Sequence, residues 1–119
     1  MAVDGGLSYN PRPSLYNAKY EVLNSTRPRD RYDTPFRLVG RHCESGDVIS
    51  PASLLPKETQ RGDLIVLPAT GAYVYVTSSR YNGVGRPPVV FVGDGKAYAV
   101  VRREAEADLF ACDVVLSGG

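Results

Sequence analysis

His42-Cys43-Glu44-Ser45-Gly46-Asp47 is the stretch around which the rest of the sequence is organised. It places a thiol beside a carboxylate, and the Ser-Gly-Asp that follows favours a turn. The apolar residues Phe36 and Val39 come just before it, which predicts a strand over residues 36–41 and puts the six residues at the rim of a sheet. On composition alone, a surface turn with an incidental cysteine is the simpler interpretation.

The composition predicts one globular domain. The chain has 119 residues, of which 43% are hydrophobic and 23% charged, as in ordinary soluble domains. A net charge of +1 gives no electrostatic signature for nucleic acid or for an anionic membrane. Two cysteines, Cys43 and Cys112, are too few for a disulfide framework and favour a reducing compartment. Without a secretory signal or an apolar run of spanning length, we expect a cytoplasmic chain with no nucleic-acid or membrane partner.

Short strands and turns dominate the expected secondary structure. With 12 Gly and 9 Pro, the chain favours a barrel or a sandwich over a parallel α/β sheet. The predicted class is all-β with one or two short helices, and Cys112 is expected to be an inert core thiol. The expected elements are strands over 18–23, 64–67 (buried on both faces) and 71–77, a linker over 51–60, a hairpin of 89–92 with 97–101 around Asp94-Gly95, and a helical turn within 104–110.

A possible anion receptor lies near the N-terminus. Pro13 suits the start of a short helix, and one turn of helix would place Tyr16 near Arg12, four residues before it. A guanidinium donates two hydrogen bonds to a carboxylate and a phenol adds a third. The alternative is an arginine that merely stacks on a tyrosine at the surface.

The chain carries no self-sufficient catalytic site. A single histidine and the lack of a Cys-x-x-Cys pair exclude the common metal clusters. His42 and Cys43 are adjacent, and adjacent residues of an extended strand point to opposite faces, which argues against a Cys-His nucleophilic pair. The three lysines, Lys19, Lys57 and Lys96, lie in polar contexts that do not activate an amine.

The order of three motifs resembles the C-terminal domain of the diaminopimelate decarboxylases, which are pyridoxal-phosphate enzymes of the alanine-racemase-like class. The motifs are Arg12-Pro13-Ser14-Leu15-Tyr16, Cys43-Glu44-Ser45-Gly46-Asp47 and Gly71-Ala72-Tyr73, and the resemblance runs from Val3 to Asp113. It implies that residues 1–119 form one Greek-key β-barrel domain. In the family this domain packs on an N-terminal (β/α)8 barrel, which holds the cofactor on a lysine and is missing from this chain.

The resemblance also implies roles for five residues. Arg12 and Tyr16 match residues that bind the distal carboxylate of the substrate. Tyr73 matches a residue that contacts the substrate and the cofactor phosphate in the same subunit. Cys43 and Glu44 match residues that cross a dimer interface into the partner's active site. There Glu44 receives the distal ammonium group, and Cys43 donates a proton after carbon dioxide leaves.

The function implied is the decarboxylation of meso-diaminopimelate to L-lysine, the last step of lysine biosynthesis, in a homodimer with pyridoxal 5'-phosphate. The isolated domain is expected to be inactive. Ornithine and arginine decarboxylases are related, but their corresponding cysteine is typically followed by Asp. Glu44, together with Arg12 and Tyr16, favours a substrate with a zwitterionic distal end. The alternative from another class is a stand-alone, non-catalytic β-barrel interaction module.

Overall fold

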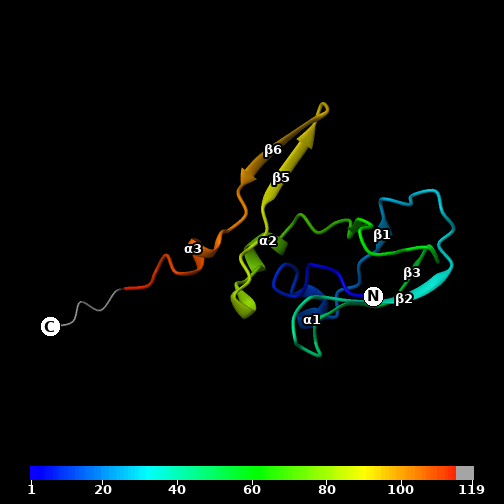
Figure 1. Cartoon of the computed structure of the whole chain (residues 1–119), viewed down its shortest axis with the longest axis horizontal. Coiled ribbons are helices and arrows are strands. Elements are labelled where there is room, and N and C mark those ends of the chain that lie inside the picture. Colours follow the sequence, from blue (N-terminus) through cyan, green and yellow to red (C-terminus); the bar gives the residue numbers. More distant parts are fainter. Residues whose placement is uncertain (115–119) are drawn as a thin grey trace. The chain divides into compact units, whose positions relative to one another are not determined.

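The structure, a computed structural model, describes residues 1–114. They form two compact units, Met1–Ser78 and a second that begins at Ser79, which we describe separately (Figure 1). The elements are α1 (Arg12–Tyr16), β1 (Leu23–Asn24), β2 (Thr34–Val39), β3 (Val48–Leu55), β4 (Ile65–Val66), α2 (Val74–Thr77), the 3₁₀ turn η1 (Tyr81–Gly83), β5 (Val89–Gly93), β6 (Lys96–Val101) and α3 (Glu106–Leu109).

The core of the first unit lies on the antiparallel pair β2–β3. Along β2 the apolar and solvent-facing residues alternate, so that Leu38 is fully buried and Arg37 is exposed. Leu38 packs with Val22 and with Leu55, the last residue of β3. Partly buried apolar residues surround these three; they are Met1, Val3, Tyr32, Phe36, Ile49, Ile65 and Leu67.

Two further contacts close this unit. The N-terminal residues run parallel to the end of β2, because the Val3 amide donates to the Val39 carbonyl and the Val39 amide donates to the Met1 carbonyl, both at 3.0 Å. In the short pair β1–β4, the buried Asn24 amide donates to Asp63 Oδ2 at 2.9 Å. This hydrogen bond, with a second from Arg27, lowers the pKa of Asp63.

The second unit is built on the hairpin β5–β6, as the sequence predicts. Its turn residues Asp94 and Gly95 have φ of 50° and 70°, the left-handed pair that a two-residue hairpin turn requires. The predicted helical turn near the C-terminus is also present as α3. The apolar side chains of the hairpin stay exposed, for example Val92 at 80% and Phe91 at 63%.

Several predicted elements are wrong. Within the predicted strand 71–77, residues Val74–Thr77 form the helical turn α2, because the Thr77 amide and hydroxyl both donate to the Tyr73 carbonyl. The predicted linker 51–60 begins inside β3, which continues to Leu55. Of the expected strand 18–23 only Leu23 belongs to a strand. The strand over 64–67 is reduced to β4, whose neighbour Leu64 is exposed. Local hydrogen bonds and tertiary pairing, more than strand propensity, decide where these strands begin and end.

The mostly-β class with short helices is confirmed, but the described residues contain three two-stranded sheets and no closed barrel. The reason is that β1 and β4 are only two residues long and β5–β6 pair only with each other, so strand edges stay open. Cys112 is exposed, which contradicts its predicted place in a core. Within residues 1–114, no helix is long and apolar enough to cross a membrane.

An ion cluster closes the base of the hairpin. Glu104 accepts hydrogen bonds from Arg80 Nη2 at 3.0 Å and from Arg86 Nε at 2.9 Å, and from the Arg86 backbone amide at 2.9 Å. These donors, the Arg80 guanidinium first, lower the pKa of Glu104 from its ordinary value of 4.5 to about 2. The charges lie 18 and 24 residues apart in the sequence, so sequence patterns give no sign of this cluster.

This cluster predicts an acid-sensitive second unit. A carboxyl whose pKa is lowered by folding stabilises the fold above its unfolded pKa, and this stabilisation is lost as the pH falls through about 4.5 towards about 2. The midpoint temperature of thermal unfolding should fall as the pH is lowered from about 6 to about 3, and this fall should be smaller in Glu104→Gln than in the wild type. Some dependence should remain, because Arg102 also lowers the pKa of Asp108.

The exposed Glu106 provides the matched control, since Glu106→Gln removes the same charge outside the cluster. An identical pH dependence in the wild type and Glu104→Gln would contradict this account of the cluster.

Candidate functional site

The loop between β2 and β3 presents the thiol and the carboxylate. Cys43 and Glu44 are both exposed. The loop turns back at once, because the Asp47 amide donates to the Glu44 carbonyl at 3.0 Å. Glu44 Oε1 lies 3.4 Å from the Gly46 amide and from Ser45 Oγ, so its carboxylate is held at the tip of the turn. The prediction of a turn at the rim of a sheet is confirmed.

The foot of the same loop is anchored by Asp47, which is only 3% exposed. Its Oδ2 accepts the His42 backbone amide at 2.9 Å and its Oδ1 accepts the Leu7 backbone amide at 2.7 Å. The His42 ring turns to the N-terminal segment, with Nε2 2.8 Å from Ser8 Oγ. The loop is therefore fixed to residues 5–8 at its base and exposed at its tip.

The predicted receptor helix is present as α1. Pro11 and Pro13 start it, and Asn17 in the left-handed region (φ 52°) ends it. The Arg12 Cζ lies 5.8 Å from the centre of the Tyr16 ring, while Tyr16 itself is 66% exposed. The Arg12 Nε is buried and has no hydrogen-bond partner among the described residues.

A hydrogen bond brings the receptor helix and the loop together. Ser14 Oγ, in the middle of α1, donates to the Gly46 carbonyl of the loop at 2.8 Å. Both residues lie in the first unit. The Arg12 guanidinium, the Tyr16 phenol and the Glu44 carboxylate are thus presented from adjoining segments that are about thirty residues apart in the sequence.

Tyr73 lies at the start of α2 and is 70% exposed. Its φ is 66°, a left-handed conformation that costs a bulky residue about 1–3 kcal/mol. The Tyr73 carbonyl accepts from Thr77 Oγ1 at 2.9 Å, which fixes this backbone within its own helical turn. Strained residues of this kind cluster at ligand-binding sites.

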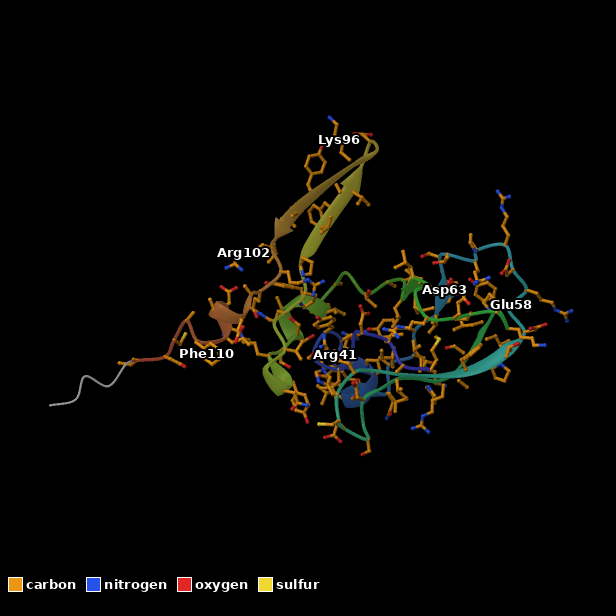
Figure 2. All side chains as sticks on the ribbon, in the orientation of Figure 1. Arg41, Glu58, Asp63, Lys96, Arg102 and Phe110 are labelled. Atoms are coloured by element: carbon orange, nitrogen blue, oxygen red, sulfur yellow. The ribbon has the colours of Figure 1, made fainter. Side chains whose placement is uncertain are left out.

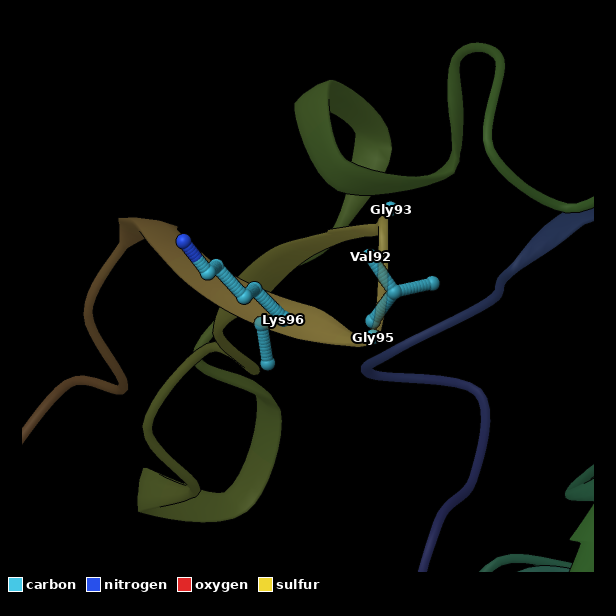
Figure 3. A pocket seen from close by; sticks show the side chains of 5 residues that line it. Val92, Gly93, Gly95 and Lys96 are labelled. Atoms are coloured by element: carbon cyan, nitrogen blue, oxygen red, sulfur yellow. The ribbon is translucent and has the colours of Figure 1, made fainter.

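The described residues do not supply the covalent anchor of a pyridoxal cofactor. Lys19, Lys57 and Lys96 are all exposed, and Lys96 projects from the tip of the β5–β6 hairpin (Figure 2). A shallow depression at this tip is open to solvent and is lined by Val92, Gly93, Gly95, Lys96 and Ala97 (Figure 3). Residues 1–114 hold no group of three or more His, Cys, Asp or Glu side chains arranged for a metal ion.

The receptor helix and the loop between β2 and β3 both lie in a region that matches a known protein family. The model of the pyridoxal-dependent decarboxylase C-terminal sheet domain matches residues 1–71, more than half of the chain. The chain belongs to this family. The match covers α1 and the loop between β2 and β3, so the receptor helix and the thiol-carboxylate loop are both inside it.

Individual relatives extend the match over nearly the whole chain. The diaminopimelate decarboxylase of Actinosynnema pretiosum subsp. auranticum is 51% identical over 114 residues, which are 96% of this chain and 26% of that protein. A diaminopimelate decarboxylase from M. jannaschii, solved with L-lysine, superposes with a TM-score of 0.85 at 30% identity over 96% of this chain and 26% of the other.

The Helicobacter pylori diaminopimelate decarboxylase, also solved with L-lysine, has a TM-score of 0.83 at 34% identity and covers 92% of this chain and 27% of its own. The chain thus spans about a quarter of the length of its relatives. The resemblance noted in the three motifs is confirmed at the level of the family.

Two features of the site were missed by reasoning from the sequence. The sequence identifies Asp47 only as a turn residue, although its side chain is buried at the foot of the loop between β2 and β3. Ser14 was recognised only as part of a helical turn, although it carries the bond to the loop. A signal for Asp47 is present in the sequence as Gly6 and Gly40, but only the fold brings these glycines to the carboxylate.

Proposed function

We propose that this chain is the C-terminal domain of a diaminopimelate decarboxylase, which converts meso-diaminopimelate to L-lysine and carbon dioxide. The observation that carries the proposal is 51% identity over 96% of the chain to an enzyme of that name. The rest of the enzyme, an N-terminal (β/α)8 barrel, would hold the pyridoxal phosphate. In the complete protein, residues 1–119 would act as one domain whose strands close into a Greek-key barrel.

Arg12 and Tyr16 would bind the distal carboxylate of the substrate. A buried donor without a partner costs about 1–3 kcal/mol, so the Arg12 Nε favours a ligand that supplies an acceptor. A carboxylate does so with two oxygens, and the exposed Tyr16 hydroxyl can donate to it as well. The guanidinium already lies over the Tyr16 ring, which fixes the two groups relative to each other.

Glu44 would bind the distal ammonium group. Its carboxylate stands at the tip of an exposed turn, where it can enter a site on another surface. A negative group for the ammonium and a positive group for the carboxylate together select a zwitterionic distal end. Ornithine and arginine lack the distal carboxylate, so this pair favours diaminopimelate over both.

Cys43 would be the acid that completes the reaction. When bound, pyridoxal phosphate takes up the electron pair left behind by departing carbon dioxide. The Cys43 Sγ–H then donates its proton to the carbon that lost the carboxylate, and the thiolate is reprotonated from solvent. A thiol is a workable acid near neutral pH, and Cys43 is exposed at the rim as this role requires.

This chain would contribute only a peripheral contact to the cofactor. Tyr73, with its exposed phenol and fixed backbone, would contact the substrate and donate to the cofactor phosphate in the same subunit. None of the three exposed lysines fits the covalent anchor, which would come from the N-terminal barrel. In a homodimer, Cys43 and Glu44 would enter the partner's site, whereas Arg12, Tyr16 and Tyr73 would serve their own.

The proposal is tested with the complete protein and three substrates. Carbon dioxide release and L-lysine formation from meso-diaminopimelate, with little turnover of ornithine or arginine, would support it. Preference for ornithine or arginine would assign the domain to a related decarboxylase. No turnover of any of the three would leave the non-catalytic interaction module.

The isolated chain gives a further prediction. Added pyridoxal phosphate should keep the spectrum of the free cofactor, and no carbon dioxide should be released from diaminopimelate. The physical reason is that Lys19, Lys57 and Lys96 are solvated, and a hydrated ammonium is a poor nucleophile towards an aldehyde. A saturable new absorbance band, lost when one of these lysines is replaced, would contradict the prediction.

A further inference from the structure

Asp47 is a buried acid whose two oxygens serve two different segments. It is 3% exposed and has no ion pair among the described residues. Its Oδ1 accepts the Leu7 amide at 2.7 Å and its Oδ2 accepts the His42 amide at 2.9 Å. A carboxylate that accepts two backbone amides is strongly held, because both bonds are charge-assisted.

Glycines make room for this carboxylate from both sides. A Cβ on Gly6 would lie 2.7 Å from Asp47 Oδ2, closer than real Cβ contacts come. A Cβ on Gly40 would press even harder on the same carboxylate. Neither glycine has a positive φ, so the reason for glycine here is space and not backbone conformation. The fold is therefore fitted to a carboxylate at this position.

The two segments that Asp47 joins lead to the two halves of the site. His42 comes directly before Cys43 and Glu44. Leu7 lies five residues before Arg12, and a tight turn, in which the Asn10 amide donates to the Gly6 carbonyl at 3.1 Å, connects it to α1. A second contact runs alongside, between His42 Nε2 and Ser8 Oγ at 2.8 Å.

We propose that Asp47 is a positioning residue of the decarboxylase site, an inference that rests on the proposed function. Its carboxylate sets where the loop presents Cys43 and Glu44 relative to the receptor helix that carries Arg12. In the proposed dimer, Cys43 and Glu44 enter the partner's site and Arg12 serves its own. The position of the loop relative to the receptor helix therefore affects the geometry of both sites. Asp47 itself touches neither substrate nor cofactor.

Asp47→Asn in the complete enzyme separates this role from simple stability. Asparagine has the same size but offers one acceptor oxygen, so its NH2 group faces one of the two backbone amides. We expect kcat/KM for diaminopimelate to fall by about tenfold to a hundredfold per cofactor-loaded site, with cofactor content and dimer unchanged. We also expect faster amide hydrogen exchange in the peptides that contain Leu7 and His42.

Two further variants guard the interpretation. Ser50, in β3, is another buried polar residue, and its hydroxyl is hydrogen-bonded to that of Ser53. Ser50→Ala removes this hydrogen bond and should leave kcat/KM unchanged even where it lowers stability. Gly40→Ala keeps Asp47 but pushes a methyl group into its carboxylate, and should repeat the loss of activity if Asp47→Asn does not fold.

The outcomes separate the two proposals. Faster exchange in both segments together with a lower kcat/KM supports the positioning role. An unchanged kcat/KM in Asp47→Asn, with or without faster exchange, overturns it while the wild type still decarboxylates diaminopimelate. A wild type that fails to decarboxylate diaminopimelate overturns the proposed function, and the positioning role with it.

Discussion

Glu44→Asp in the complete enzyme should lower kcat/KM for diaminopimelate by about 30-fold or more. The substitution keeps the negative charge but withdraws it by one methylene from the distal ammonium group. Loss of a desolvated charge contact costs about 2 kcal/mol or more, and about 1.4 kcal/mol corresponds to each factor of ten in rate. Steady-state kinetics of purified, cofactor-loaded enzyme measures this directly.

Two variants calibrate the result. Tyr16→Phe should be milder, because Arg12 would still pair with the distal carboxylate after the phenol hydroxyl is lost. Glu58→Asp makes the same chemical change at an exposed position beyond β3 and should leave kcat/KM at the wild-type level (Figure 2). An unchanged kcat/KM in Glu44→Asp would mean that Glu44 does not bind the ammonium group.

Short sequence patterns predicted the elements whose conformation depends mainly on residues close together in the chain. The hairpin β5–β6 follows from Asp94-Gly95, since this dipeptide tolerates the positive φ that the turn requires. The strand that precedes Cys43 follows from the apolar residues at positions 36–39. The receptor helix follows from Pro13 and from the four-residue spacing of Arg12 and Tyr16.

The rest depends on a strained backbone conformation or on partners far away in the sequence, and short sequence patterns reveal neither. Residues 73–77 are all β-branched or aromatic, yet Val74–Thr77 form α2, because Tyr73 adopts a left-handed backbone and its carbonyl accepts hydrogen bonds from Thr77. Glu104 pairs with Arg86 and Arg80, which lie 18 and 24 residues away in the sequence. The role of Asp47 needs Gly6 and Gly40 brought to it by the fold, so no spacing rule could assign it.

The roles of the five site residues come from the resemblance, and the structure adds a specific question about them. The hydrogen bond from Ser14 to the Gly46 carbonyl brings α1 and the Cys43 loop together within one chain. A site formed by a single subunit is therefore the natural alternative to a site shared by two. The central claim is that Arg12 and Cys43 of one chain serve different active sites.

Mixing two inactive variants of the complete enzyme, Arg12→Ala and Cys43→Ala, tests this claim most directly. With equal amounts and free exchange, half of the dimers are mixed, and in each of them one site has both an intact Arg12 and an intact Cys43 from the partner. Activity should return to about a quarter of the wild-type level by this symmetry count. If both residues served the same subunit's site, no mixed dimer could contain an intact site. Activity that stays at the level of the separate variants, with mixed dimers demonstrated by mass, would contradict the shared site.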